Sequence, residues 1–129
     1  MAKSIHDDVL DAALNYIKTN GDKMTVCEGE PTTYEHANSQ KGTGTGKALG
    51  SAVLASGDYT VTADSSGRKV TIAAQADEDV DQTGDGDHVA IVDTANSKLL
   101  KVATCTLQAL VAGNKVSFPA WKINIQDPT

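Results

Sequence analysis

The sequence predicts a mainly β fold, an antiparallel β-sandwich or jelly-roll-like pair of sheets preceded by one N-terminal α-helix. Short runs rich in Val, Ile and Thr recur along the chain and are separated by Gly, Asn and Asp, the residues that favour turns. Helical periodicity is clear only in the first segment. A chain of 129 residues is long enough to bury one core. We therefore expect an N-terminal helix within residues 1–21 and a single β domain over residues 22–129.

The N-terminal segment is predicted to be an amphipathic helix from Ile5 to Thr19. Ser4 is the expected N-cap, and Asn20-Gly21 is the expected stop. Such a helix either covers its own β core or binds a neighbouring subunit, and both alternatives remain open. The apolar positions that recur at helical spacing, and that we expect to contact a partner, are Ile5, Val9, Leu10, Leu14 and Ile17.

The stretch from His88 to Cys105 is predicted to be a β-hairpin around the turn Thr94–Ser97. Its first arm is apolar at every position from Val89 to Val92, so both of its faces should be covered, which places it centrally in the sheet. Its second arm alternates more clearly, with Leu100 and Val102 on the face opposite Lys101. One face of that arm should therefore meet water or a partner.

Several further strands follow from the same reasoning. Pro119 within the last of them predicts an edge position or a bulge, because proline has no N–H to donate. The predicted strands are Lys23–Cys27, Tyr59–Thr62, Arg68–Ala74 and Lys115–Ile125; one helical turn is expected at Thr33–Asn38, loops at Ser39–Ser51 and Asp77–His88, and either a strand or a crossing segment at Thr106–Ala112.

The charge balance excludes some partners. Seventeen acidic and eleven basic side chains give a net charge of −6, and the single arginine is Arg68. Binding to nucleic acid or to an anionic membrane requires many Lys and Arg side chains, so neither partner is expected. No apolar run is long enough to span a bilayer or to act as a signal core. In a reducing cytosol, Cys27 and Cys105 are expected to be small buried residues rather than a disulfide.

Two stretches resemble ligand-binding loops in composition only. The glycine-rich run before Lys47 lacks the phosphate-loop pattern, because Lys41 replaces its first glycine and Ala48 its Ser or Thr. It is therefore expected to be a flexible surface loop. The acidic stretch 77–87 resembles a calcium loop that begins at Asp79. The twelfth place of such a loop carries a glutamate that binds the ion, and in this chain that place is Ala90. We expect a solvated loop, with weak binding of Ca²⁺ or Mg²⁺ left open.

No catalytic, cofactor or metal site is predicted. The three histidines, His6, His36 and His88, do not cluster, and neither cysteine lies near a histidine in the sequence. Trp121 is expected to anchor a core or an interface, because its ring is large and its N–H needs a partner. These observations favour a non-enzymatic protein.

Short segments throughout the chain are similar to those of a family of small virion proteins encoded by tailed bacteriophages. None of them is a chemical signature, and together they cover nearly the whole chain. The segments that carry the resemblance are Asp11–Ile17, Glu30–Tyr34, Ser66–Thr71, His88–Asp93, Pro119–Trp121 and Asp127–Thr129.

The resemblance implies a capsid decoration (cement) protein that is made in the host cytoplasm and lies on the capsid surface of the virion. It would bind the major capsid protein, form a homo-oligomer and stabilise the lattice. A head–tail connector or tail component is the alternative within structural proteins, and a carbohydrate- or surface-binding β module is the alternative from another class. Subunit contacts are expected from the helix and from the loop residues Lys41, Gly44 and Lys47.

Overall fold

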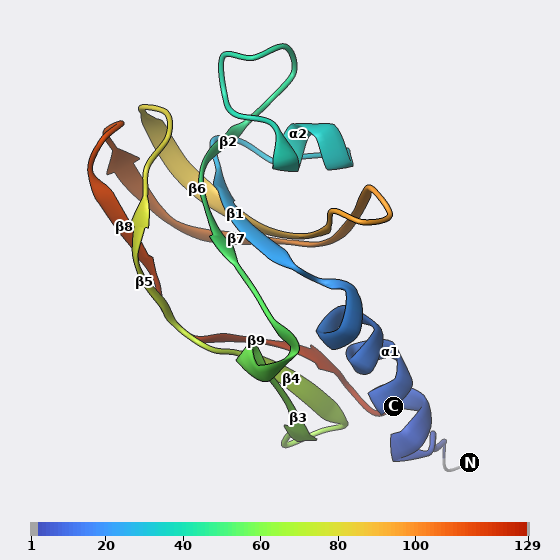
Figure 1. Cartoon of the computed structure of the whole chain (residues 1–129). Helices are drawn as coiled ribbons and strands as arrows, with labels where there is room; N and C mark the ends of the chain where they lie inside the picture. The colour runs from blue at the N-terminus through green and yellow to red at the C-terminus, as the bar shows by residue number, and fades with distance from the viewer. Residues whose placement is uncertain (1–2, 129) are drawn as a thin grey trace.

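The computed structural model describes residues 3–128 and confirms the predicted fold class, a mainly β, antiparallel, sandwich-like chain with one N-terminal helix (Figure 1). The elements are α1 (Asp7–Asn20), β1 (Lys23–Cys27), α2 (Tyr34–Asn38), β2 (Ala48–Val53), the short 3₁₀ helix η1 (Ser56–Asp58), β3 (Tyr59–Ala63), β4 (Arg68–Ile72), β5 (Gln75–Asp79), β6 (Gly84–Asp93), β7 (Lys98–Leu110), β8 (Lys115–Phe118) and β9 (Trp121–Ile125).

Four strands form the largest sheet, in the order β2-β1-β6-β7. The predicted hairpin is β6–β7, and β6 lies between β1 and β7 as expected. One face of β6 contributes Ile91 to the main core, while Ala90 and Val92 face a second cluster with Ala37 of α2. The prediction that this strand is covered on both faces is therefore confirmed.

The second arm of the hairpin is less regular than its sequence indicates. Ile91 lies opposite Lys101 and Val92 opposite Leu99, so Leu100 is an extra residue in the ladder. Because of this bulge, Leu100 packs against the main core while Val102 packs against the second cluster. The expectation that Leu100 and Val102 share one face was wrong.

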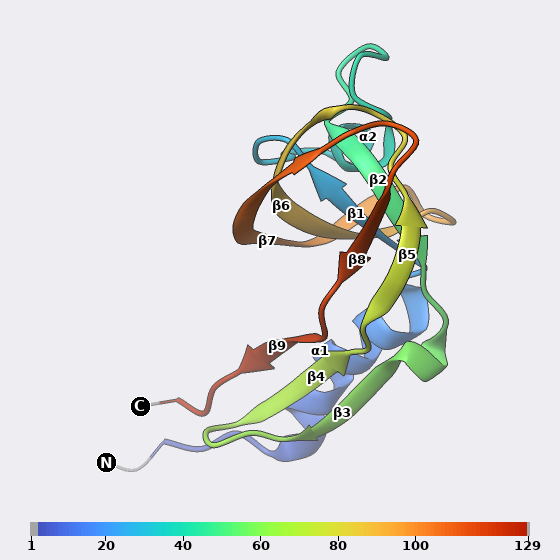
Figure 2. The same cartoon turned by 90° about the vertical axis from the view of Figure 1, so that its left-hand side faces the viewer.

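The predicted last strand is in fact two strands that belong to different sheets. Pro119 and Ala120 separate β8, which pairs with β5, from β9, which pairs with β4 beside β3 (Figure 2). Proline cannot donate a ladder hydrogen bond, so pairing stops there and resumes with a new partner. The segment Arg68–Ala74 likewise ends at Ile72, and the chain continues into β5.

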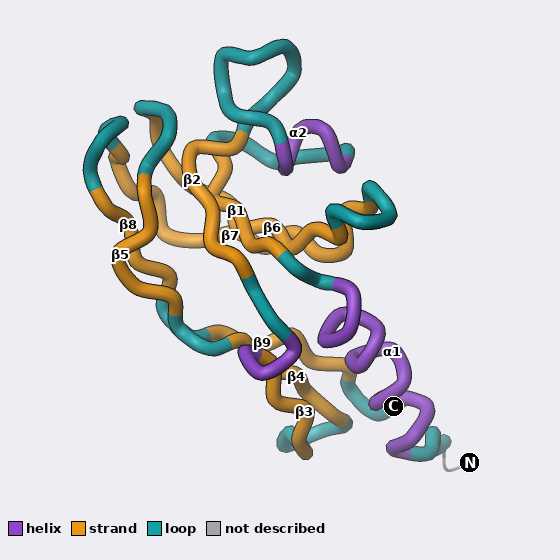
Figure 3. Tube along the Cα trace, viewed as in Figure 1, coloured by secondary structure: helices purple, strands orange, loops and turns teal. Residues whose placement is uncertain are grey.

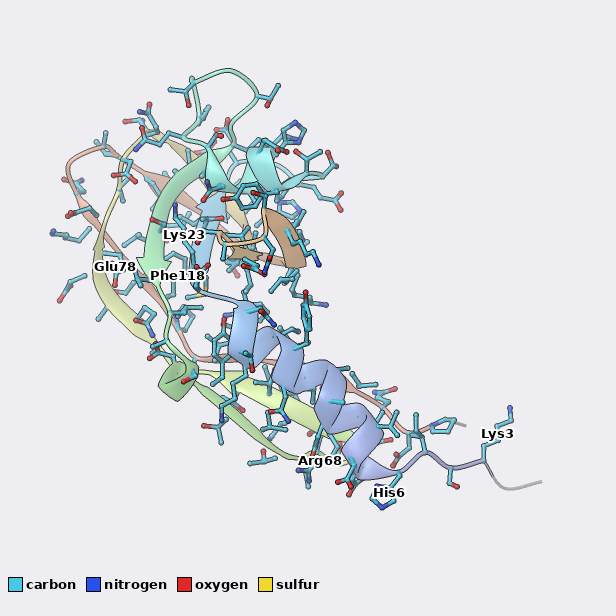
Figure 4. All side chains as sticks on the ribbon, turned by 45° about the vertical axis from the view of Figure 1, so that its right-hand side comes forward. Lys3, His6, Lys23, Arg68, Glu78 and Phe118 are labelled. Atoms are coloured by element: carbon cyan, nitrogen blue, oxygen red, sulfur yellow. The ribbon has the colours of Figure 1, made fainter. Side chains whose placement is uncertain are left out.

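Helix α1 lies against the sheet formed by β3, β4 and β9. Leu10 and Leu14 are buried, and Leu14 belongs to the same core as the strands. Arg68 on β4 donates from Nε and Nη2 to the Asp11 carboxylate at 2.7 and 3.1 Å, which fixes the helix to the sheet from outside the core (Figure 4). These contacts show that the helix covers the β core of its own chain, which was the first of the two alternatives.

Both ends of α1 differ in detail from the prediction. The N-cap is His6, whose Nδ1 accepts from the Asp8 N–H at 3.1 Å, and not Ser4, because the helix begins at Asp7. Gly21 ends the helix with φ of −75°, outside the left-handed region. A Cβ atom there would lie 2.6 Å from the Tyr59 Oη and 2.8 Å from both the Ile17 O and the Ile91 Cγ2, so lack of space explains this glycine.

Two predicted loops contain strands. Ala48–Val53 is β2, so only the first part of the expected loop 39–51 remains a loop. Within Asp77–His88, β5 extends to Asp79 and β6 begins at Gly84. Gly86 stands in β6 because a Cβ atom there would lie 2.6 Å from the Val26 Cγ2. A glycine required by close packing resembles a turn residue in the sequence.

The chain ends lie near each other, at the end of the molecule that carries α1 (Figures 1 and 2). Asp127 is held at the β3–β4 turn, where its N–H donates to the Ser66 Oγ at 3.3 Å and its carboxylate accepts from the Gly67 N–H at 3.1 Å. The groove described next lies toward the opposite end.

Candidate docking groove between β7 and β8

β7 and β8 are joined by the short turn 111–114 but do not pair with each other. β7 pairs with β6 from Lys98 to Leu110, with bulges at Leu100 and at residues 105–107, and β8 pairs with β5 in a different sheet. The two strands diverge from the turn, as both views of the ribbon show (Figures 1 and 2). The turn itself is fixed by the hydrogen bonds from Val80 N to Asn114 O and from Gly113 N to Val80 O, both 3.0 Å.

The space between the diverging strands is a groove composed of three adjoining hollows. The largest, about 440 Å³, reaches the core residues Val26, Leu110 and Phe118. A hollow of about 120 Å³ adjoins it on the side of Ala103 and Trp121. A third, of about 350 Å³, continues it toward the β7–β8 turn. The residues shared by neighbouring hollows are Val89, Cys105, Phe118 and Pro119 on one side, and Gln108, Leu110, Val116 and Ser117 on the other.

The groove is nearly free of charge, in contrast to the rest of the chain. From Val102 to Asn114 there is no Asp, Glu, Lys or Arg, and this is the longest such run in the sequence. Among the lining residues only Lys115 is charged, and its ammonium is paired with the Asp79 carboxylate. The surface can therefore make apolar contacts and backbone hydrogen bonds, and it offers little to a charged ligand.

One strand of the groove is exposed over consecutive residues. Every residue from Thr104 to Ala109 is exposed, and Leu107 is 59% exposed. Residues 105–107 bulge away from β6, because the register passes from Gly86 opposite Gln108 to His88 opposite Thr104. Large apolar side chains in contact with water are thus found beside an opening into the core.

Cys105 lies in the middle of this groove and does not have the properties of a nucleophile. Partial loss of solvent around the sulfur, and secondarily the negative charge of Asp87, raise the pKa of its thiol above the ordinary value, so the unreactive protonated form predominates. Cys27, buried in the second cluster, also has a raised pKa through burial. Both thiols are free. The expectation of burial is confirmed for Cys27 and was wrong for Cys105, because β7 bulges outward there.

The predicted contact residues of the N-terminal segment differ in their exposure to solvent. Leu10 and Leu14 are 4% and 1% exposed and pack within this chain, so they are not available to a partner. Ile17 is half-buried against the core. Ile5 and Val9 are 38% and 57% exposed and remain available.

The predicted contact residues of the glycine-rich loop lie far from α1, at the other end of the molecule beside α2 (Figure 3). Lys41 is paired with the Glu28 carboxylate, and the Lys47 Nζ donates to the Glu30 O at 2.8 Å. Both lysines thus attach the loop to the segment after β1. Gly44, with φ of +62°, has open space around it and forms the free tip.

The other candidate ligand residues are not brought together. His88 contacts the neighbouring Asp87 at 2.8 Å, His36 lies 3.1 Å from the Thr32 hydroxyl, and His6 caps α1. Residues 3–128 contain no group of three or more His, Cys, Asp or Glu side chains that could hold a metal ion. Trp121 is half-buried against the core, and its Nε1 donates to the Met24 Sδ at 3.3 Å, which confirms that its N–H has a partner.

The groove was missed by reasoning from sequence. Thr106–Ala112 was left open as a strand or a crossing segment, and the division of the segment Lys115–Ile125 at Pro119 was not foreseen. The sequence nevertheless contained a signal for this strand. The run from Val102 to Asn114 has no charged residue, although the chain has a net charge of −6.

Comparison with protein-family models, curated proteins and solved structures finds no match to this chain. Within residues 3–128, no helix has the length and apolar character needed to cross a membrane.

Proposed function

We propose that this protein is a non-enzymatic structural component of a bacteriophage virion, a capsid decoration (cement) protein that binds the major capsid protein and stabilises the capsid lattice. It is made in the host cytoplasm and acts on the capsid surface. The observation that supports this proposal best is the groove between β7 and β8, which is nearly free of charge and reaches apolar core residues.

The groove is suited to contact with a macromolecule. Burial of apolar surface contributes about 25 cal/mol per Å², so a protein that stabilises a lattice gains most from broad apolar contact. An unpaired strand edge adds backbone hydrogen bonds to such a contact. The Cys105 thiol in the groove is held in its protonated form, so the most reactive group there is not activated for chemistry.

The contacts to the capsid protein are assigned to the exposed part of α1 and to the tip of the glycine-rich loop. Val9 is exposed on the first turn of the helix and Ile5 is exposed just before it, while the buried residues of the helix hold it in place. The glycine-rich loop that contains Gly44 projects from the far side of the molecule. A small protein with contact points at both ends can bridge neighbouring subunits of a shell.

The same surfaces would serve a head–tail connector or tail component, the second candidate within structural proteins. Copy number separates the two. Reconstruction of virions should show lattice-scale numbers of copies on the head for a decoration protein and one ring at a single vertex for a connector.

A carbohydrate-binding module receives less support. Sugar recognition by stacking requires free aromatic faces. The indole N–H of Trp121 is bonded to Met24, and the Tyr16 ring, 44% exposed, has the Lys98 ammonium 5.8 Å from its centre.

The direct test is addition of the purified protein to undecorated shells, followed by measurement of the shell's thermal disruption. Wild type should raise the disruption temperature, and the double variant Ile5→Asp, Val9→Asp should raise it less. Val53→Asp is the matched control, because Val53 is 81% exposed on β2, away from both proposed contacts. No gain with wild type contradicts the decoration function.

A further inference from the structure

We propose that Asn20 is a site of spontaneous deamidation, protected while the C-terminal end of α1 is packed against the strands and reactive when that end opens. The inference goes beyond the proposed function and does not depend on it. Asn20-Gly21 is the one Asn-Gly step in the 129 residues. Glycine has no side chain to shield its backbone nitrogen and restricts the backbone least, so asparagine before glycine is especially labile in an unfolded chain.

The reaction needs only water as a co-reactant. The Gly21 backbone nitrogen loses its proton to solvent and attacks the side-chain carbonyl carbon of Asn20, and the side-chain nitrogen leaves as ammonia. Water then opens the resulting cyclic imide at either of its carbonyl carbons. One product is aspartate. The other is isoaspartate, in which the main chain runs through the former side-chain carbon and is lengthened by a methylene.

The folded structure holds both reacting groups apart. The Gly21 N–H donates to the Ile17 O at 2.7 Å, and the Asn20 Nδ2 donates to the Tyr16 O at 2.9 Å. Asn20 is the last residue of α1, and helical backbone angles direct the next nitrogen along the helix axis. The nitrogen therefore faces the Ile17 O and not the side-chain carbon that it has to attack.

Contacts beyond the helix fix Gly21 further. The hydroxyl of Tyr59, which is buried on β3, donates to the Gly21 O at 2.7 Å, and the N–H of the next residue, Asp22, donates to the Val92 O at 3.2 Å. Only glycine fits here, because a Cβ atom would lie 2.6 Å from the Tyr59 Oη. The packing that requires a labile step thus also prevents the rotation that its reaction needs.

This protection lasts only as long as the end of the helix stays in place. Segments at the ends of elements open at a lower free energy than the core of a protein. When the last turn of α1 separates from the strands, the hydrogen bonds of Asn20 and Gly21 are lost together. The step then has the freedom that it has in an unfolded chain, so deamidation at Asn20 records opening of the helix.

Deamidation should also make the opening harder to reverse. An aspartate carboxylate at position 20 has no N–H to donate to the Tyr16 O. It places a negative charge at the C-terminal end of the helix, where the helix dipole disfavours it. Isoaspartate lengthens the main chain beside Gly21, which has no free space around it. Either product should therefore weaken the packing of α1.

The test measures the rate of deamidation of Asn20 in the full chain by peptide mapping and mass spectrometry, with aspartate and isoaspartate separated by chromatography. In urea, Asn20 should react faster than the other asparagines. In the folded chain its rate should be at least about tenfold lower at the same pH and temperature. Leu14→Ala should raise the folded-state rate at least about tenfold, because Leu14 is buried and anchors the helix.

Asp11→Asn is a second variant that loosens the helix, because it weakens the bond to Arg68 without opening a cavity in the core. It should raise the rate at least about twofold. Leu107→Ala is the matched control, since Leu107 is 59% exposed at the other end of the molecule, and it should react as wild type does. Asn20→Gln should remove the product, and circular dichroism should show that the variants are folded.

Equal rates at Asn20 in the folded chain and in urea overturn the inference, as does a folded-state rate that neither Leu14→Ala nor Asp11→Asn raises. Absence of deamidation at Asn20 in urea overturns it as well. Hydrogen exchange separates local from global opening. The rate at Asn20 should follow exchange of the Gly21 N–H, and a rate that follows exchange of the Ile91 N–H in the central strand β6 contradicts opening of the helix end.

Discussion

The two ends of this molecule differ in how their strands are covered. At one end, α1 covers the sheet β3-β4-β9, with Leu10 and Leu14 buried and Arg68 bonded to Asp11. At the other, β7 and β8 separate and leave Leu107 and Cys105 exposed beside an opening into the core.

The difference shows how a short chain distributes its covering elements. An amphipathic helix can cover a whole sheet face at the cost of few residues, and this chain uses one such helix there. Among residues 3–128 no helix covers the groove between β7 and β8. Variants that affect one end and spare the other are the way to test this division.

The largest effect is expected from Leu14→Ala. Leu14 is 1% exposed within the main core, so its truncation should lower the free energy of unfolding by about 3 kcal/mol, measured by urea denaturation. Leu107→Ala at the groove is the comparison, and a change within about 0.5 kcal/mol is expected because Leu107 is 59% exposed. The comparison should be made at a protein concentration at which wild type is monomeric. Equal losses would show that the groove strand is as much a part of the core as the helix.

The joint between α1 and the strands should be the next most sensitive position. Gly21→Ala places a Cβ atom 2.6 Å from the Tyr59 Oη, so we expect a loss of about 1–3 kcal/mol from overpacking. Gly57→Ala is the control, since nothing lies within 4 Å of its Cβ position and the substitution restricts the unfolded chain. Urea denaturation of both variants gives the measurement, and a neutral Gly21→Ala contradicts the role given to this glycine.

Acid should weaken the covered end. The Lys122 ammonium, with the Ser65 N–H, holds the pKa of Asp64 below its ordinary value. A carboxylate with a lowered pKa stabilises the fold at pH above the ordinary aspartate value of about 3.9, and this contribution is lost as the pH falls through the lower folded pKa. The urea midpoint should therefore fall less between pH 6 and pH 3 in Asp64→Asn than in wild type. Identical pH profiles would mean that this ion pair adds nothing to stability.

The smallest effect concerns reactivity alone. A thiol reagent at pH 8 should modify Cys105 slowly, because its pKa is raised, and should leave the buried Cys27 unmodified until the chain unfolds. Mass spectrometry after labelling identifies the modified residue. Equal labelling of both thiols would contradict the burial of Cys27.

Local sequence pattern predicted the elements whose cause is local. The spacing of Leu10 and Leu14 indicated α1, and the run Val89–Val92 indicated a central strand, because periodicity reports burial directly. The helical turn expected at Thr33–Asn38 is α2, Tyr34–Asn38, and Thr33 is its N-cap, where its hydroxyl accepts from the His36 N–H at 3.2 Å.

Choices between distant partners could not be predicted in this way. Whether the segment around Pro119 continues in one sheet or changes sheets depends on its partners β4 and β5, which are distant in the sequence. Gly86 resembled a turn residue because its neighbour across the core, Val26, is distant in the sequence. The groove depends on the change of sheet at Pro119 and on the packing of Gly86 against Val26. Because neither could be predicted, the groove could not be predicted either.

The placement of the chain ends has a practical consequence. Asp127 is bonded at the β3–β4 turn, and α1 begins near the same sheet, so whatever is fused to either end emerges on the side away from the groove. Affinity tags, fluorescent proteins or displayed antigens attached there should leave the mouth between β7 and β8 unobstructed. Fusions at either end are therefore expected to leave the groove accessible.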